Sequence, residues 1–409
     1  MTTLFTNAER RITTLAFTLM LATTGFAQGE TQRLFTTTEG QVPYRIPAIT
    51  TTRRGTLIAV ADYRYCESDI GYGPIDLRYR LSNDNGLTWS EEQTLADGTG
   101  DEHDVMSPRT AWRYAFGDCA IVADSRSDEV IAMCVGGKTV YARATRENPN
   151  RVVLFRSRDG GKKWDLGTEL TDQIYGLLDK RQAGAVNSLF VGSGKIHQSR
   201  YVRVGRYYRL YAALCSLSGN FVIYSDDFGR TWNVLGDPNI SPAHDGDEPK
   251  CEELPDGSVI LSSRFNGRLY NIFTFTNARK TQGKWDTRAE AADMADIQNE
   301  CNGEIILLKA RRAADGKKVW LALQSIPFGP GRHNVGFFYH ELKKRHETAA
   351  EFASNWKRGL QVSHQSSAYS TFTLQHDHRL GFLWEEGPTV FNIDYRSLSI
   401  EEITQGEYR

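Results

Sequence analysis

A turn-forming motif occurs three times along the chain and constrains its fold more than any other feature. The copies fit the pattern S-x-D-x-G-x-x-W and span Ser82–Trp89, Ser157–Trp164 and Ser225–Trp232. Each follows a short run of β-branched and aromatic residues, which is typical of a strand leading into a turn. The Ser and Asp side chains can accept backbone hydrogen bonds, and the Gly suits a positive φ. We predict a hairpin turn at each copy, with the Trp starting the next strand and packing beneath the turn. Because one catalytic site cannot account for three copies, we give these carboxylates a structural role.

The spacing of the motif indicates the architecture. The three Trp residues are separated by 75 and 68 residues, and two later stretches, ending at Trp285 and Trp356, are decayed copies. Strands without helical periodicity at this interval suit four-stranded propeller blades. We predict an all-β fold, a six-bladed β-propeller of four-stranded antiparallel blades, with both termini closing the sixth blade. A β-helix or sandwich is the alternative, but neither needs one turn motif at blade-length intervals. The polar segment His340–Trp356 is expected to be a short surface helix or an expanded hairpin loop.

The first residues indicate export. Arg10 and Arg11 precede an apolar stretch over 12–27 that ends in small residues, which is typical of a signal peptide. A membrane anchor is the alternative, but sixteen residues are short for a span. We therefore expect residues 1–27 to be removed and 28–409 to form a single catalytic domain, periplasmic or secreted. The net charge of −1 and the absence of any charge block argue against nucleic acid as a binding partner and against insertion into a membrane. We expect a monomer.

The cysteines exclude a disulfide-stapled scaffold. The six cysteines form no CxxC pair and none lies close to a His, so we expect no metal site and no cofactor. A two-residue turn at Arg126-Ser127 would place Cys119 opposite Cys134. Such a pair is near the limit of disulfide geometry, so a cross-strand disulfide and two buried free thiols both remain possible.

Three arginines have unusual settings. Arg45, Arg264 and Arg332 lie at the starts or ends of apolar strand-like runs and are far apart in the sequence. A single such Arg is ordinarily a surface charge with a packed stem. Three of them favour a shared anion site.

The segment Tyr44-Arg45-Ile46-Pro47, followed by several S-x-D-x-G-x-x-W turns, resembles the bacterial and trypanosomal sialidase (neuraminidase) family. The resemblance runs from about residue 40 to 396. It implies a retaining exo-α-sialidase, which hydrolyses terminal α-ketosidic sialic acids from glycoproteins, glycolipids and oligosaccharides. Carried over by position, Arg45, Arg264 and Arg332 bind the substrate carboxylate through charge-assisted bonds, and Glu385 orients Arg45.

The resemblance also implies the catalytic groups. Tyr369 matches the nucleophile and Glu248 its partner base. A neutral phenol suits an anionic substrate, but its ordinary pKa near ~10 requires such a base. Asp69, which would otherwise be a turn former in a loop rich in Gly and Pro, matches the general acid/base.

Two further residues, Arg64 and Asp118, match sugar-binding positions. The chain departs from the family at Gly117-Asp118-Cys119, where the family commonly has Gly-Asp-Pro. Asp104 and Trp112, in the preceding loop, are expected near the pocket without an assigned role.

Two other functions remain. A trans-sialidase would share the same site. A non-catalytic glycan-binding propeller would keep the turn motifs but lose the arginines or the Tyr–Glu pair, and this chain retains both.

Overall fold

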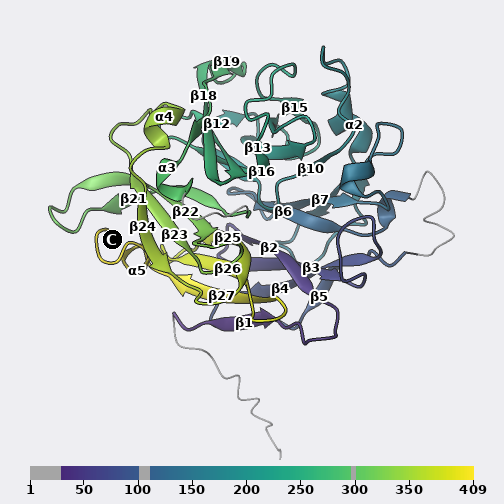
Figure 1. Cartoon of the computed structure of the whole chain (residues 1–409), viewed down its shortest axis with the longest axis horizontal. Coiled ribbons are helices and arrows are strands. Elements are labelled where there is room, and N and C mark those ends of the chain that lie inside the picture. Colours follow the sequence, from purple (N-terminus) through teal and green to yellow (C-terminus); the bar gives the residue numbers. More distant parts are fainter. Residues whose placement is uncertain (1–28, 101–110, 296–300) are drawn as a thin grey trace, which may run out of the picture.

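Six small sheets, antiparallel apart from one short parallel pairing in the second, are arranged around a common centre (Figure 1). The computed structural model describes residues 29–100, 111–295 and 301–409. Consecutive sheets pack side by side in chain order, and the sixth packs against the first. The predicted six-bladed β-propeller is therefore confirmed. The proposed signal segment, 1–27, lies outside the described residues.

Each blade runs outward from an innermost strand. Blade 1 holds β2 (Tyr44–Thr51), β3 (Leu57–Arg64), β4 (Ile75–Ser82) and β5 (Gln93–Ala96). Blade 2 holds β6 (Gly117–Ala123), β7 (Val130–Gly136), β8 (Arg151–Ser157) and β9 (Thr168–Glu169), with β11 (Gly194–Lys195) parallel to β6. Blade 3 holds β13 (Tyr207–Ser216), β14 (Phe221–Ser225) and β15 (Asn233–Val234), and its inner edge is shared by β10 (Leu189–Val191) and β12 (His197–Val204).

The second half of the ring is built in the same way. Blade 4 holds β16 (Asp247–Glu253), β17 (Val259–Phe265), β18 (Gly267–Asn277), β19 (Gln282–Trp285) and β20 (Ala289–Glu290). Blade 5 holds β21 (Ile305–Arg311), β22 (Lys318–Pro327), β23 (Val335–Glu341) and β24 (Lys357–Gln361). Blade 6 holds β25 (Ser367–Leu374), β26 (Leu380–Glu386) and β27 (Asn392–Leu398).

The ring is closed by the first strand of the chain. β1 (Gln32–Phe35) pairs antiparallel with β27, so the first and last strands of the described chain share blade 6, as predicted. Arg33 on β1 also forms a 2.9 Å ion pair with Asp394 on β27. β1 thus completes blade 6 as its outermost strand, while the innermost strands β2 and β25 bring blades 1 and 6 together.

The three motif turns have the predicted chemistry. In the first copy, the Ser82 hydroxyl accepts from the Gly86 N–H at 2.9 Å, and the Asp84 carboxylate accepts from the Thr88 N–H at 2.9 Å. The other two copies repeat these contacts. Since each turn follows the third strand of a blade, all three lie at the ends where the innermost strands finish. No residue of these turns is among those that line the pocket at the opposite end of the ring.

The Trp residues of the motif differ from the prediction. Trp232 directly precedes β15 and is 2% exposed, whereas Trp89 and Trp164 stand several residues before β5 and β9 and are half-buried. In the decayed copies, Trp285 lies in β19 and Trp356 directly precedes β24.

The remaining helical elements are short. They are the 3₁₀ turns η1 (Ala111–Arg113) and η2 (Tyr141–Arg143), and helices α2 (Thr171–Gly176), α3 (Ala292–Ala295), α4 (Ala349–Phe352) and α5 (Ile400–Ile403). The segment His340–Trp356 is an expanded hairpin loop that carries α4. It is less superficial than predicted, because Phe352 is buried and His340 pairs with the buried Glu347 at 2.9 Å.

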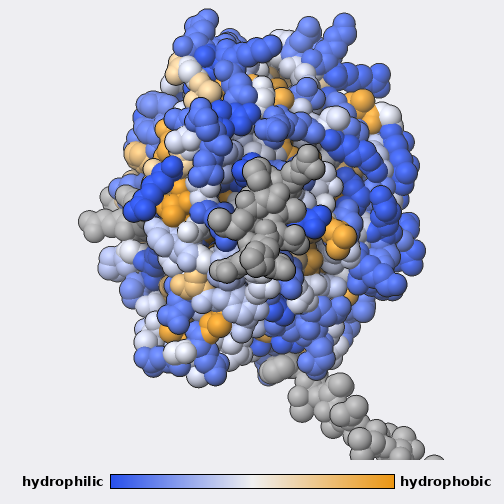
Figure 2. Space-filling model, turned by 90° about the vertical axis from the view of Figure 1, so that its right-hand side faces the viewer, coloured by the Kyte–Doolittle hydropathy of each residue, from blue (hydrophilic) through white to orange (hydrophobic). Residues whose placement is uncertain are grey.

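Apolar side chains lie within and between the blades. In Figure 2, the visible face is mostly hydrophilic with scattered hydrophobic residues.

All six cysteines are free thiols, and Cys119 and Cys134 are both fully buried. Trp112 packs in the core between blades 1 and 2, so the expectation that it shapes the pocket is wrong, and Asp104 lies outside the described residues. None of the helices in the described part of the chain has the length and hydropathy needed to cross a membrane.

Candidate active site

Four innermost strands are irregular where they begin. The pairing register shifts near the start of β2, β6, β16 and β25. A bulge of this kind bends a strand and re-aims its side chains. The shifted segments contain or border Arg45, Asp118, Glu248 and Tyr369. The blades therefore direct these four side chains into one pocket at the mouth of the ring.

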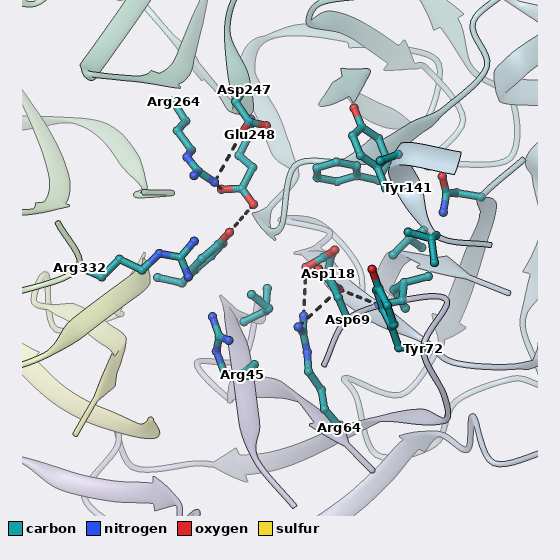
Figure 3. Close-up of a pocket in the computed structure, with 18 residues that line it drawn as sticks. Arg45, Arg64, Asp69, Tyr72, Asp118, Tyr141, Asp247, Glu248, Arg264 and Arg332 are labelled. Carbon is teal, nitrogen blue, oxygen red and sulfur yellow. Dashed lines mark hydrogen bonds and ion pairs between the residues drawn. The ribbon is translucent and has the colours of Figure 1, made fainter. Parts of the chain in front are cut away.

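The structure brings eight of the nine predicted site residues to this pocket, which encloses about 410 Å³. They are Arg45, Arg64, Asp69, Asp118, Glu248, Arg264, Arg332 and Tyr369. Figure 3 shows Arg264, Arg332 and Glu248 on one side, Arg64, Asp69 and Asp118 on the other, and Arg45 between them. The ninth residue, Glu385, is fully buried behind Arg45.

The three arginines differ in how far they are neutralised. Arg45 is paired with Glu385 at 2.7 Å, and Arg264 with Glu248 at 2.9 Å. Arg332 has no ion pair with any carboxylate in the described ranges, and its guanidinium lies 5.3 Å from the centre of the Tyr369 ring. The cluster therefore retains positive charge that is available to an anion.

Glu385 fixes several parts of the site at once. Its carboxylate accepts from the Arg45 side chain at 2.7 and 3.3 Å, and from the backbone N–H groups of Ile46 at 2.8 Å and Tyr369 at 3.2 Å. Ile46 has φ of 51°, a rare conformation for a β-branched residue. Glu385 thus holds the start of β2 against the start of β25.

Tyr369 and Glu248 form the shortest contact in the pocket. The phenol donates to Glu248 Oε1 at 2.5 Å, while Glu248 Oε2 accepts from Arg264 at 2.9 Å. Burial raises the pKa of the Tyr369 phenol well above its ordinary value, and the negative charge of Glu248 raises it further. The phenol is therefore neutral at rest, with a base in direct contact.

The opposite wall contains three carboxylates around one arginine. Arg64 is buried and lies 2.9 Å from Asp62, 3.4 Å from Asp69 and 3.7 Å from Asp118. Burial raises the pKa of the Asp118 carboxyl well above its ordinary value, and the charges of Asp69 and Asp62 add to this effect. The Asp69 side chain is 60% exposed, on the loop between β3 and β4. It is therefore accessible to a molecule entering the pocket.

Several residues in or behind the pocket were not predicted from the sequence. Asp62 is fully buried behind Arg64; it lies two positions before Arg64 on the same side of β3, and the D-x-R spacing could have indicated this pair. Asp247 lies 3.5 Å from Arg264. An apolar wall of Ile70, Tyr141 and Phe190 lines the remaining space. No local pattern distinguishes these apolar residues from core residues.

Fold and site together define a class: a six-bladed propeller with an arginine cluster and a phenol–carboxylate pair at one mouth. The sequence is homologous to bacterial proteins named sialidase. It is 27% identical over 371 residues to one from Micromonospora viridifaciens (86% of this chain, 51% of that protein), and 22% identical over 387 residues to one from Bacteroides fragilis (89% and 63%). The chain thus spans about half to two-thirds of the length of these relatives.

A solved structure shares the fold. A leech intramolecular trans-sialidase superposes with a TM-score of 0.70 at 16% identity, over 93% of this chain and 71% of the leech protein. No family model matches the sequence.

Proposed function

We propose that this protein is an exo-α-sialidase that hydrolyses terminal sialic acids from glycoconjugates with retention of configuration. The 2.5 Å contact between Tyr369 and Glu248, beside the arginine cluster, carries this proposal. It supplies a nucleophile and its base next to a site for a carboxylate. The homology to sialidases supports the same substrate class.

Binding begins with the substrate carboxylate. Planar guanidinium groups hold carboxylates through charge-assisted, often bidentate bonds. Arg332 contributes a charge that no carboxylate of the described residues neutralises, while Arg45 and Arg264 are held in place by Glu385 and Glu248. The anomeric carbon, which bears this carboxylate, then lies beside Tyr369.

The first chemical step forms a bond between the Tyr369 phenol oxygen and the anomeric carbon. The phenolic proton moves to Glu248, and the glycosidic bond breaks as protonated Asp69 donates its proton to the leaving oxygen. A neutral nucleophile avoids the repulsion that a carboxylate would meet from the substrate's own carboxylate.

The second step reverses these roles. Asp69 takes a proton from water, and the water oxygen attacks the anomeric carbon. The phenol leaves and recovers its proton from Glu248. Two displacements restore the configuration, so the α-anomer of free sialic acid is released first. Arg64 and Asp118 contact sugar hydroxyls on the opposite wall.

The test compares two variants on two substrates. Asp69→Ala should lose about 10²–10⁴-fold on sialyllactose, the range expected for general acid catalysis. It should lose far less on an aryl sialoside, whose phenolate leaves without protonation. Tyr369→Phe should impair both substrates, because attack at the anomeric carbon is common to them.

Melting temperatures and product NMR complete the experiment. NMR on sialyllactose isomers reports the anomer, the linkage preference and any transfer to an acceptor. Full activity of Tyr369→Phe would refute the nucleophile assignment. Equal losses of Asp69→Ala on both substrates would show that Asp69 positions the sugar and does not donate the proton.

A further inference from the structure

A second, larger cavity lies at the other end of the ring. It encloses about 1040 Å³ and shares no lining residue with the candidate active site. Its walls include the last residues of β21 and the end of β25, whereas the site lies where the innermost strands begin. β21, α5 and the C-terminus, which border this cavity, lie on one side of the ring in Figure 1. We call it the distal groove.

The distal groove is strongly cationic. No Asp or Glu side chain lines it, and its basic side chains are Arg200, Lys309, Arg311, Lys318, Arg345 and Arg409. Arg200 is paired with Glu252 at 2.5 Å. Lys309, Arg311, Lys318 and Arg345 have no ion pair with a carboxylate among the described residues. Even with the terminal carboxylate of Arg409 counted, the groove has excess positive charge, although the whole chain has a net charge of −1.

Two of these cations face each other across a strand pair. Arg311 on β21 is directly opposite Lys318 on β22, and like charges in this position destabilise a sheet. The adjacent Arg312 shows the usual solution, since it pairs with Asp315 at 2.7 Å and with Glu341 at 2.5 Å. Arg311 and Lys318 have no such side-chain carboxylate among the described residues, although a terminal carboxylate oxygen of Arg409 accepts from the Arg311 backbone N–H at 2.7 Å. An anionic ligand between the two side chains would supply the missing compensation.

Aromatic and apolar surface adjoins the cations. Trp320 is half-buried, and the Lys309 ammonium lies 5.4 Å from the centre of its ring. Tyr201 and Leu374, both in the lining, are each 40% exposed. A sugar ring presents C–H groups to an aromatic face, while its acidic substituents meet the cations. This combination suits an anionic sugar better than a small inorganic anion.

We propose that the distal groove is a second binding site for an acidic oligosaccharide, whose sugars carry carboxylate or sulfate groups. The choice of a saccharide over other polyanions rests on the proposed function, which gives this protein anionic glycans as substrates. Binding at the distal groove holds the protein on an acidic glycan while the active site, at the other end of the ring, stays open to terminal residues.

The test measures binding of fluorescent octasaccharides to the full chain. Heparin provides sulfate and carboxylate, hyaluronan provides carboxylate alone, and a neutral octasaccharide is the uncharged comparison. Lys318→Gln and Lys309→Gln should each weaken binding of at least one acidic octasaccharide by about tenfold, the loss of one charge-assisted contact. Lys317→Gln is the matched control, because Lys317 is exposed on the same hairpin but does not line the groove. Added salt should weaken binding.

Melting temperatures show whether a variant that loses binding is still folded. Two further polyanions show whether the groove selects saccharides or attracts any negative charge. Lys318→Gln should keep or raise the melting temperature, since it removes the like-charge pair, so lost binding cannot reflect unfolding. Absence of binding by both acidic octasaccharides, or an equal loss in Lys317→Gln, would overturn the proposal. Tighter groove-dependent binding of a single-stranded oligonucleotide or an anionic vesicle would overturn the saccharide assignment.

A further variant tests whether binding at the distal groove is independent of the active site. Tyr369→Phe should retain groove-dependent binding even though it lacks hydrolysis. If the unaltered protein fails to cleave sialosides but binds acidic octasaccharides through Lys318, the proposed function fails and the distal groove stands.

Discussion

Replacing Glu385 by Gln should test how much of the site depends on one buried carboxylate. Gln has nearly the same shape, so the change removes charge without opening a cavity. The amide oxygen can replace Oε1, which serves the Arg45 Nε and the Ile46 N–H. The amide nitrogen cannot replace Oε2, which accepts from Arg45 and from the Tyr369 N–H.

The magnitude follows from burial. Removing one partner of a buried ion pair costs about 3–5 kcal/mol. The Glu385 side chain is fully buried, but that of Arg45 is 21% exposed, so water screens part of the loss. We expect the free energy of unfolding to fall by about 2–4 kcal/mol. The carboxylate of a ligand should also bind more weakly, because Arg45 loses its fixed orientation.

Urea unfolding followed by tryptophan fluorescence measures the first effect, and calorimetric titration with a sialic acid glycal measures the second. Glu386→Gln is the matched control: Glu386 is the next residue on β26 and accepts from Gln365 at 2.8 Å, but it has no ion pair with a described arginine or lysine. If Glu385→Gln unfolds within ~0.5 kcal/mol of the parent and binds the glycal equally well, the scaffold role is refuted.

Three further predictions concern stability and redox state. Trp232→Ala should cost about 3–5 kcal/mol, as for a buried aromatic, and Trp164→Ala distinctly less because Trp164 is half-buried; equal losses in urea unfolding would contradict this ranking. Asp118→Asn should stabilise the protein at pH 7, because burial raises the pKa of Asp118 in the folded state and ionisation then favours unfolding. The gain should vanish below pH ~4, where the carboxyl is protonated in both states, and a gain independent of pH would disprove the cause. Thiol titration of denatured, unreduced protein should find all six cysteines free, whereas four would indicate the disulfide between Cys119 and Cys134.

The sequence predicts the parts of the fold whose interactions are local. In each motif turn, the Ser and Asp side chains accept hydrogen bonds from backbone groups within four residues. The residue pattern alone is therefore enough to predict the turn. The interrupted inner edge of blade 3 has no such local cause. There, β11 pairs with β6 of the neighbouring blade, and this exchange depends on packing between blades.

The residues of the candidate active site could be predicted only from the resemblance to a known family. Arg45 and Glu385 are 340 residues apart, and Tyr369 and Glu248 are 121 apart, so no spacing rule could have paired them. The bulges that aim these side chains were not predicted either, because register is decided by the partner strand. Asp62 is different, because its position two residues before Arg64 could have predicted that the two side chains lie on the same side of the strand. It was missed because it matched no role that the resemblance implied.

The closure of blade 6 has a consequence for the order of folding. The ion pair between Arg33 and Asp394 joins residues 361 positions apart, so β1 is synthesised long before its partner strand exists. Until β27 emerges, β1 and the edge of blade 1 lack their neighbours, and contacts of such long range form slowly. We therefore expect the ring to close late, only after β27 has been synthesised. A truncated or stalled chain would expose unpaired strand edges, which invite pairing with other chains.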